Sequence, residues 1–153
     1  MIVDSVHFWV NDMHVDDWDL LTTNQDVFRF FTQMIAFRKA HPSLGRSRFW
    51  REDVRWYGVA GAPDLSVDSH SFAWYLDGAS QQDVDVYVMV NAFWQALTFV
   101  VQEGQPEHWR CVVDTGRASP DDVCEPGSEP LLHDLRYAVG PRSVVVLVRP
   151  RLA

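Results

Sequence analysis

The spacing of apolar residues changes once along this chain, near Pro42. Before Pro42, apolar side chains recur every three or four residues, the period of an amphipathic helix. Two such stripes predict helices over residues 2–13 and 24–41. Their members are Ile2, Val6, Trp9, Val10 and Met13, and then Val27, Phe28, Phe30, Phe31, Met34, Ile35 and Phe37. Thr23 and Asp26 form a capping-box pattern at the start of the second helix, and Pro42 ends it.

After Pro42 the period becomes two, the alternation of a β-strand. The alternating segments lie at residues 54–57, 71–76, 84–91, 97–101 and 109–113. Turn-forming stretches such as GAPD, LDGAS and EPGSEP separate them. Residues 144–148 are a continuous apolar run, typical of a strand buried on both faces. The Pro- and acid-rich stretch 115–134 predicts a long surface loop.

These patterns predict a mainly β chain. We expect residues 1–45 to be a helical segment with two α-helices. Residues 46–153 should form an antiparallel β-sandwich of about six to eight strands. The helix over 24–41 is predicted to pack against that sandwich.

The charge of the chain excludes several classes of partner. The net charge is −8 and the pI is about 5.0, which disfavours binding to nucleic acid or to an anionic membrane. No apolar run is long enough to span a bilayer, and no signal peptide precedes the first helix. Cys111 and Cys124 lack the spacing of a metal or redox motif. We therefore expect a cytoplasmic protein with reduced thiols and no cofactor.

The polar residues predict no catalytic or metal site. Three acidic pairs occur along the chain: Glu52/Asp53, Asp83/Asp85 and Asp121/Asp122. Neighbouring residues of a strand point to opposite faces, and acidic residues in turns are usually solvated, so we interpret all three pairs as surface charge. The six histidines have no metal-ligand spacing, and GxSxG, P-loop and GxGxxG motifs are absent from the sequence.

Aromatic residues are abundant, with seven Trp, nine Phe and four Tyr. A large aromatic core accounts for most of them. Trp56, Trp74 and Trp109 lie on the apolar parity of their strands and are expected in that core. Trp94, in a turn, and Tyr57, off the apolar parity, are the candidates for stacking against a sugar.

Longer phrases of the sequence carry a family resemblance. They are DWDLLTTNQDVFRFFTQMIAFRKAHPSL, VRWYGVAGAPDLSVDSHSFAWYLDG, DVYVMVNAFWQALTFVV, WRCVVDTGRASPDDV and YAVGPRSVVVLVRP. In this order, from Asp17 to Arg151, the chain resembles the C-terminal part of isoamylase-type glycogen debranching enzymes. These belong to the α-amylase superfamily and cut α-1,6 branch links. The resemblance implies a last barrel helix followed by the C-terminal β-sandwich.

The first sixteen residues resemble a different place in the same family. SVHFWVNDMHVD looks like the approach to the nucleophile motif M-H-V-D-G-F-R-F-D, but Asp17 begins another phrase directly after Asp16. The resemblance therefore implies that most of the catalytic barrel is missing. With it would go the three catalytic carboxylates, since Asp19, the residue nearest the break, fits a capping or surface role better.

Three functional hypotheses follow. The first is a non-catalytic C-terminal β-sandwich portion of a glycogen-debranching protein, acting in packing or assembly. The alternative is an α-glucan-binding module, and a further alternative is an active glycoside hydrolase of glycogen metabolism. Because no barrel would cover the apolar helices, we also expect a homodimer through residues 2–13 and 24–41.

Overall fold

The computed structural model describes residues 23–45 and 52–151. The predicted helix over 2–13 therefore lies outside the described residues. The chain divides into two compact units, with the boundary between Phe37 and Arg38. None of the described helices is both long and apolar enough to cross a membrane.

The predicted helix over 24–41 is confirmed as α3 (Gln25–Ala40). Asp26 in its first turn and Arg38 and Lys39 in its last turn match the helix dipole in sign. Four of its apolar side chains are 45–61% exposed, namely Val27, Phe28, Phe31 and Ile35, whereas Phe30, Met34 and Phe37 are half-buried. The packing of this helix against the sandwich stays a prediction.

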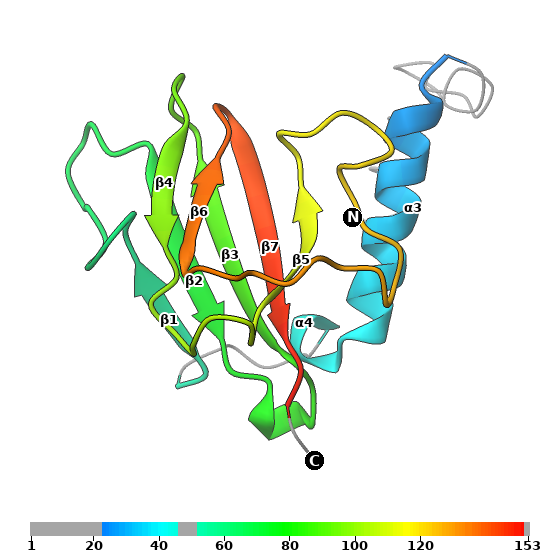
Figure 1. Ribbon diagram of the computed structural model, residues 1–153, viewed down its shortest axis with the longest axis horizontal. Coiled ribbons are helices and arrows are strands. Elements are labelled where there is room, and N and C mark those ends of the chain that lie inside the picture. The colour runs from blue at the N-terminus through cyan, green and yellow to red at the C-terminus, as the bar shows by residue number, and fades with distance from the viewer. Residues whose placement is uncertain (1–22, 46–51, 152–153) are drawn as a thin grey trace, which may run out of the picture. The chain divides into compact units, whose positions relative to one another are not determined.

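The remaining unit is an antiparallel β-sandwich, as the sequence predicts (Figure 1). After the last residues of α3, its first complete element is the short helix α4 (Pro42–Gly45). A five-stranded sheet follows the order β1-β2-β3-β7-β5, and a two-stranded sheet pairs β4 with β6. The strands are β1 (Val54–Tyr57), β2 (Ser71–Leu76), β3 (Asp85–Asn91), β4 (Leu97–Val100), β5 (Arg110–Asp114), β6 (Arg136–Val139) and β7 (Ser143–Arg149). Strand β6 is not predicted from periodicity, because its four residues are too few to show a clear alternation in the sequence, although their burial alternates in the structure.

The inner face of the five-stranded sheet and the two-stranded sheet enclose the main core. Its fully buried side chains include large aromatic residues of different strands: Tyr87, Phe99 and Trp109. The Tyr87 and Trp109 rings meet edge to face, with centroids 5.8 Å apart, a favoured aromatic geometry. The prediction that Trp109 is a core residue is thus confirmed.

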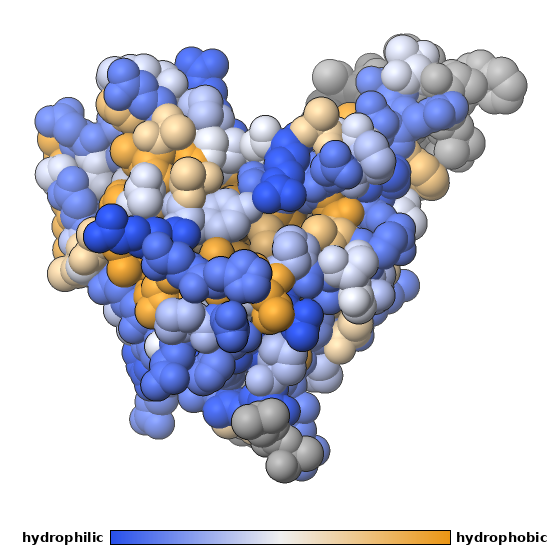
Figure 2. Space-filling model, viewed as in Figure 1, coloured by the Kyte–Doolittle hydropathy of each residue, from blue (hydrophilic) through white to orange (hydrophobic). Residues whose placement is uncertain are grey.

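The outer face of the same sheet is also apolar. Leu76, Val86 and Val88 are buried there, with Leu44 of α4 and Val84 among the residues packed against them. Strand β3 is buried on both sides along most of its length, and the predicted two-sided burial of residues 144–148 in β7 agrees with alternating buried and half-buried positions. By contrast, three of the four outward residues of the two-stranded sheet are exposed, and the fourth, Val100, is half-buried. Over β4 and β6 Figure 2 shows small apolar patches between hydrophilic side chains.

This two-sided apolar character explains a wrong expectation. Trp56 is 59% exposed, although its parity predicted a core position, and Trp74 is half-buried. Trp56 lies on the outer face, opposite Trp74 in the register of β1 and β2. Its neighbour Tyr57 turns inward and stacks on Tyr87 at 5.9 Å. When both faces of a strand carry aromatic residues, alternation does not reveal which face is the core.

The stretch 115–134 runs mostly as a loop but is tied to the sandwich. Isolated β-bridges join Val113 to Val123 and Arg110 to Leu131. Val123 and Leu132 are buried. The predicted surface loop therefore also contributes two apolar side chains to the interior.

Candidate functional site

The most enclosed acidic group of the described residues is Asp85, the first residue of β3. Its side chain is only 2% exposed. In the register of the sheet Asp85 lies opposite Arg149, close to the end of β7, so chain segments 64 residues apart bring opposite charges together. This pairing explains how a carboxylate is tolerated in a strand that is otherwise buried.

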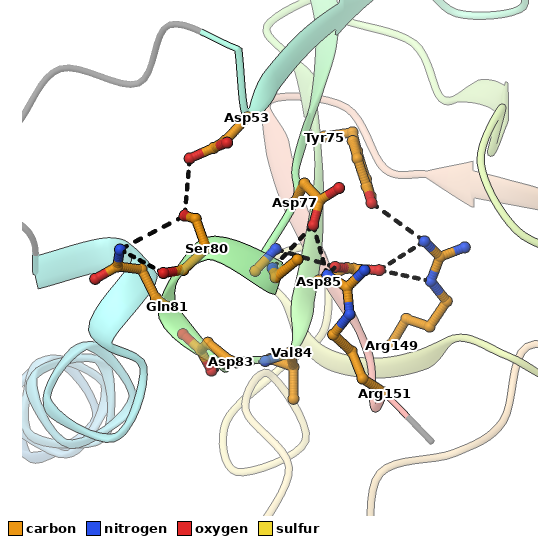
Figure 3. Close-up of polar contacts among 12 residues, drawn as sticks. Asp53, Tyr75, Asp77, Ser80, Gln81, Asp83, Val84, Asp85, Arg149 and Arg151 are labelled. Carbon is orange, nitrogen blue, oxygen red and sulfur yellow. Dashed lines mark hydrogen bonds and ion pairs between the residues drawn. The ribbon is translucent and has the colours of Figure 1, made fainter. Parts of the chain in front are cut away.

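Four donors occupy the Asp85 carboxylate (Figure 3). Oδ1 accepts from the Gly78 backbone N–H at 3.0 Å and from Arg151 Nη1 at 2.7 Å. Oδ2 accepts from Arg149 Nε at 2.9 Å and Nη2 at 2.6 Å. A carboxylate has about four acceptor positions, so Asp85 has none left for a substrate. Chemically this group is a clamp between the end of β7 and the β2–β3 connection.

The guanidinium group of Arg149 also contacts two aromatic rings. Arg149 lies 5.0 Å from the centroid of Trp109 and 5.7 Å from that of Tyr75, within cation–π range. Its Nη2 also donates to the Tyr75 hydroxyl at 3.2 Å. Burial, and then the nearby charge of Asp85, raises the pKa of Tyr75 to about 12.

The other member of this acidic pair, Asp83, anchors the start of the sandwich unit. Its Oδ1 lies 2.8 Å from His41 Nδ1, and its Oδ2 accepts from the Ser43 backbone N–H at 3.0 Å. Burial acts to raise the pKa of Asp83, but the hydrogen bonds from His41, Ser43 and Val84 outweigh it and hold that pKa below the usual value. Asp83 therefore fixes α4 against the β2–β3 connection.

These contacts correct the interpretation of Asp83/Asp85 as surface charge. Both side chains are at most 5% exposed. They engage different partners, His41 for Asp83 and Arg149 with Arg151 for Asp85. The pair is therefore not a dyad that could share one proton. The partners lie more than 40 residues away along the chain, so local spacing carried no signal of this burial.

A second buried carboxylate, Asp114, ends β5. Its Oδ2 accepts from the Tyr137 hydroxyl at 2.8 Å and from Arg117 Nε at 3.2 Å. The Gly116 backbone N–H donates to Oδ1. The pKa of Tyr137 is raised, first by burial and then by Cys111 and Asp114. This cluster joins β5 to β6, so its role is also structural.

The remaining predicted candidates are less enclosed. Glu52 and Asp121 are exposed, and Asp53 and Asp122 are half-buried. Cys111 and Cys124 are free thiols, and burial raises the pKa of both. Within residues 23–45 and 52–151, no cluster of three His, Cys, Asp or Glu side chains could hold a metal ion.

The two predicted sugar-stacking residues have different environments. Trp94, in the turn after β3, is 63% exposed, and its ring centroid lies 3.9 Å from that of Phe93. Tyr57 is half-buried, and its hydroxyl donates to Glu103 Oε1, which Arg55 also contacts. Trp94 therefore presents a ring face to solvent, whereas Tyr57 is engaged within the sandwich. Glucan stacking by either residue stays a prediction.

Comparison with known proteins identifies relatives of this sandwich. A family model described as "Isoamylase, C-terminal" matches residues 53–148. An isoamylase of Flavobacterium sp. is 30% identical over 152 residues, covering 86% of this chain and 20% of that protein. The chloroplastic isoamylase 3 of Oryza sativa subsp. japonica is 32% identical over 135 residues, covering 85% of this chain and 16% of that protein. The chain thus spans a fifth or less of the length of these relatives.

Solved structures share the fold at lower identity. A pullulanase from Bacillus acidopullulyticus matches with a TM-score of 0.60 and 19% identity, over 87% of this chain and 15% of that one. Pullulanase type I from Bacillus subtilis, solved with maltose, matches with a TM-score of 0.61 and 20% identity, over 88% of this chain and 17% of that one.

Proposed function

This chain belongs to the isoamylase C-terminal family, and we propose that it is the non-catalytic β-sandwich portion of a glycogen-debranching, isoamylase-type protein. In this proposal its work is packing or assembly rather than chemistry. The proposal gives this chain no debranching activity of its own. The expected cytoplasmic location stays a prediction.

The observation that carries the proposal is the apolar outer face of the five-stranded sheet. An antiparallel sheet in a free-standing sandwich normally turns a polar face to water. Here the outward positions are apolar on four adjacent strands: Val54 and Trp56, then Phe72, Trp74 and Leu76, then Val86, Val88 and Val90, and then Val144, Val146 and Val148. Such a face is typical of a layer that packs on further protein structure.

The described carboxylates support the non-catalytic part of the proposal. A retaining glycosidase needs two accessible carboxyl groups about 5–5.5 Å apart. Asp85 and Asp114 are buried and hydrogen-bonded by neighbouring donors, and Asp83 holds α4. None of these three is open to a substrate.

A complementation experiment tests the packing role. The Flavobacterium isoamylase would be expressed without the C-terminal fifth that matches this chain, with or without the full 153-residue chain supplied separately. We expect the added chain to increase the yield of folded enzyme and to raise its Tm.

The Val90→Lys variant, changed at a half-buried outer-face position, should complement less well. Lysine at Val67, which is 99% exposed, serves as the matched control. Equal yield and Tm with and without the chain would contradict the packing role.

A further inference from the structure

Exposed aromatic residues follow a line of neighbouring positions in β1, β2 and the turn after β3. Trp56 of β1 and Phe72 of β2 have ring centroids 6.0 Å apart. His70 precedes Phe72 by two residues, which corresponds to about 6.8 Å of backbone along an extended strand. The ladder continues at this point, because the Ala92 N–H donates to the His70 carbonyl at 2.8 Å.

The line continues into the turn after β3. The His70 and Phe93 ring centroids are 6.2 Å apart, and those of Phe93 and Trp94 are 3.9 Å apart. We call Trp56, Phe72, His70, Phe93 and Trp94 the aromatic track. Four of its five members are exposed and Phe93 is half-buried. Both ends are tryptophans, 59% and 63% exposed.

The end of the track at Trp94 is held rigidly. Asn91 is buried, and its Nδ2 donates to the carbonyls of Gln95 and Gly140 at 2.9 and 2.8 Å. Its Oδ1 accepts from the Phe93 N–H at 3.0 Å, and the Arg142 N–H donates to the Phe93 carbonyl. Trp94 is thus presented on a fixed turn, so binding a ligand there costs little ordering entropy.

The chemistry of the track fits a polymer with repeated apolar faces. Sugar rings offer C–H faces to aromatic rings and hydroxyls to polar neighbours. Exposed Gln95 follows Trp94 in the chain, and exposed Arg142 donates its backbone N–H to the Phe93 carbonyl. On the outer face Leu76, Val86 and Val88 are buried, and Val54, Val90, Val144 and Val146 are half-buried. The aromatic residues at its margin are the more exposed part of this face.

We propose that the aromatic track binds one α-linked glucan chain, which stacks on Trp56 and Phe72 at one end and on Phe93 and Trp94 at the other. The choice of an α-linked glucan rests on the proposed function, whereas the track itself rests on ring positions. One chain that contacts both ends gains affinity through effective concentration, so binding depends on chain length.

Affinity electrophoresis of the full chain through gels containing amylopectin tests the site. We expect retardation by amylopectin and none by a β-linked glucan. Trp56→Ala and Trp94→Ala should each weaken binding roughly fivefold, the effect of losing one stacking contact. Phenylalanine at Trp56 should restore most of it. Alanine at Leu65, which is 90% exposed and off the track, is the matched control and should change nothing.

Length dependence separates a track from a single stacking residue. Titration with maltose and with maltoheptaose, followed by tryptophan fluorescence, should show tighter binding of the longer sugar. Either alanine variant should lose most of that difference. No retardation by amylopectin, equal retardation by a β-linked glucan, or a Trp56→Ala variant that binds like the unmodified chain would each overturn the proposal.

The complementation experiment distinguishes this failure from failure of the packing role. The Trp94→Ala variant should still stabilise the truncated Flavobacterium isoamylase, because Trp94 lies in the turn after β3 and is not among the outer-face positions. If Trp56→Ala instead abolishes complementation while the unmodified chain ignores glucan, the aromatic margin is a protein-docking surface and the glucan proposal is wrong.

Discussion

Asp85 shows how much a single side chain contributes to this sandwich. It is buried against Arg149 and Arg151 and also accepts a backbone N–H from Gly78. Removing one partner of a buried ion pair leaves the remaining charge uncompensated, which costs more than the pair contributes.

We predict that Asp85→Asn lowers the free energy of unfolding by about 3 kcal/mol, because two guanidinium groups lose their carboxylate. Urea unfolding at pH 7 measures this loss. Asp68→Asn, at an exposed position, is the control and should leave the urea midpoint nearly unchanged. Equal midpoints for the Asp85 variant and the unmodified chain would show that the clamp is not stabilising.

The raised pKa of Tyr75 should make the free energy of unfolding fall at alkaline pH. Its pKa of about 12 in the folded state exceeds the ordinary value of about 10. The folded state therefore favours the neutral hydroxyl, and this contribution is complete below about pH 10 and is lost as the pH rises towards 12.

We predict that the Tyr75→Phe variant loses less stability than the unmodified chain between pH 9 and about 11.5, by about 1 kcal/mol. Part of the loss remains in the variant because burial also raises the pKa of Tyr87 to about 12. Urea unfolding across this pH range is the measurement. Parallel pH profiles for the two proteins would contradict the assignment.

Among the elements, α4 depends most clearly on one contact. Asp83 holds it through His41 and the Ser43 backbone N–H. The pKa of Asp83 is depressed in the folded state, so its contribution is present above about pH 4 and is lost as the pH falls further.

We predict that Asp83→Asn speeds hydrogen exchange of the amides in residues 41–45 at pH 7, and lowers the free energy of unfolding by about 1–2 kcal/mol. Towards pH 3 the difference between the two proteins should narrow, because the stabilisation that comes from a depressed carboxylate pKa fades below about pH 4. A stability difference that is the same at pH 7 and pH 3 would mean that charge has no part in the anchor.

The elements also show how far local sequence patterns reach. The spacing of apolar residues predicts helix α3 and six of the seven strands, because an element buried on one side carries apolar residues at regular intervals. The side that each residue faces does not follow where both faces are apolar, as at Trp56. The burial of Asp85 depends on the register of β3 with β7, and the aromatic track depends on β1, β2 and the turn after β3 meeting in space. Neither the burial of Asp85 nor the aromatic track can be predicted from residues that are neighbours in the sequence.

For the whole molecule, the exposed apolar side chains of α3 motivate our proposal of a homodimer through residues 2–13 and 24–41. We predict about twice the 17.6 kDa chain mass at micromolar concentration, measured by light scattering after size exclusion. Lysine at Phe31, which is 61% exposed, should shift the mass towards one chain, whereas lysine at Leu65 should not. A monomeric mass for the unmodified chain would rule the dimer out.

The central claim is that this sandwich acts without chemistry of its own. Reducing-end release from amylopectin tests it most directly, with the Flavobacterium isoamylase as the positive control and a no-protein reaction as the baseline. We predict that the purified full chain releases reducing ends at the baseline rate, even at chain concentrations far above the enzyme concentration in the positive control. Release above baseline that co-purifies with the 17.6 kDa chain, and disappears when the chain is unfolded, would contradict the claim.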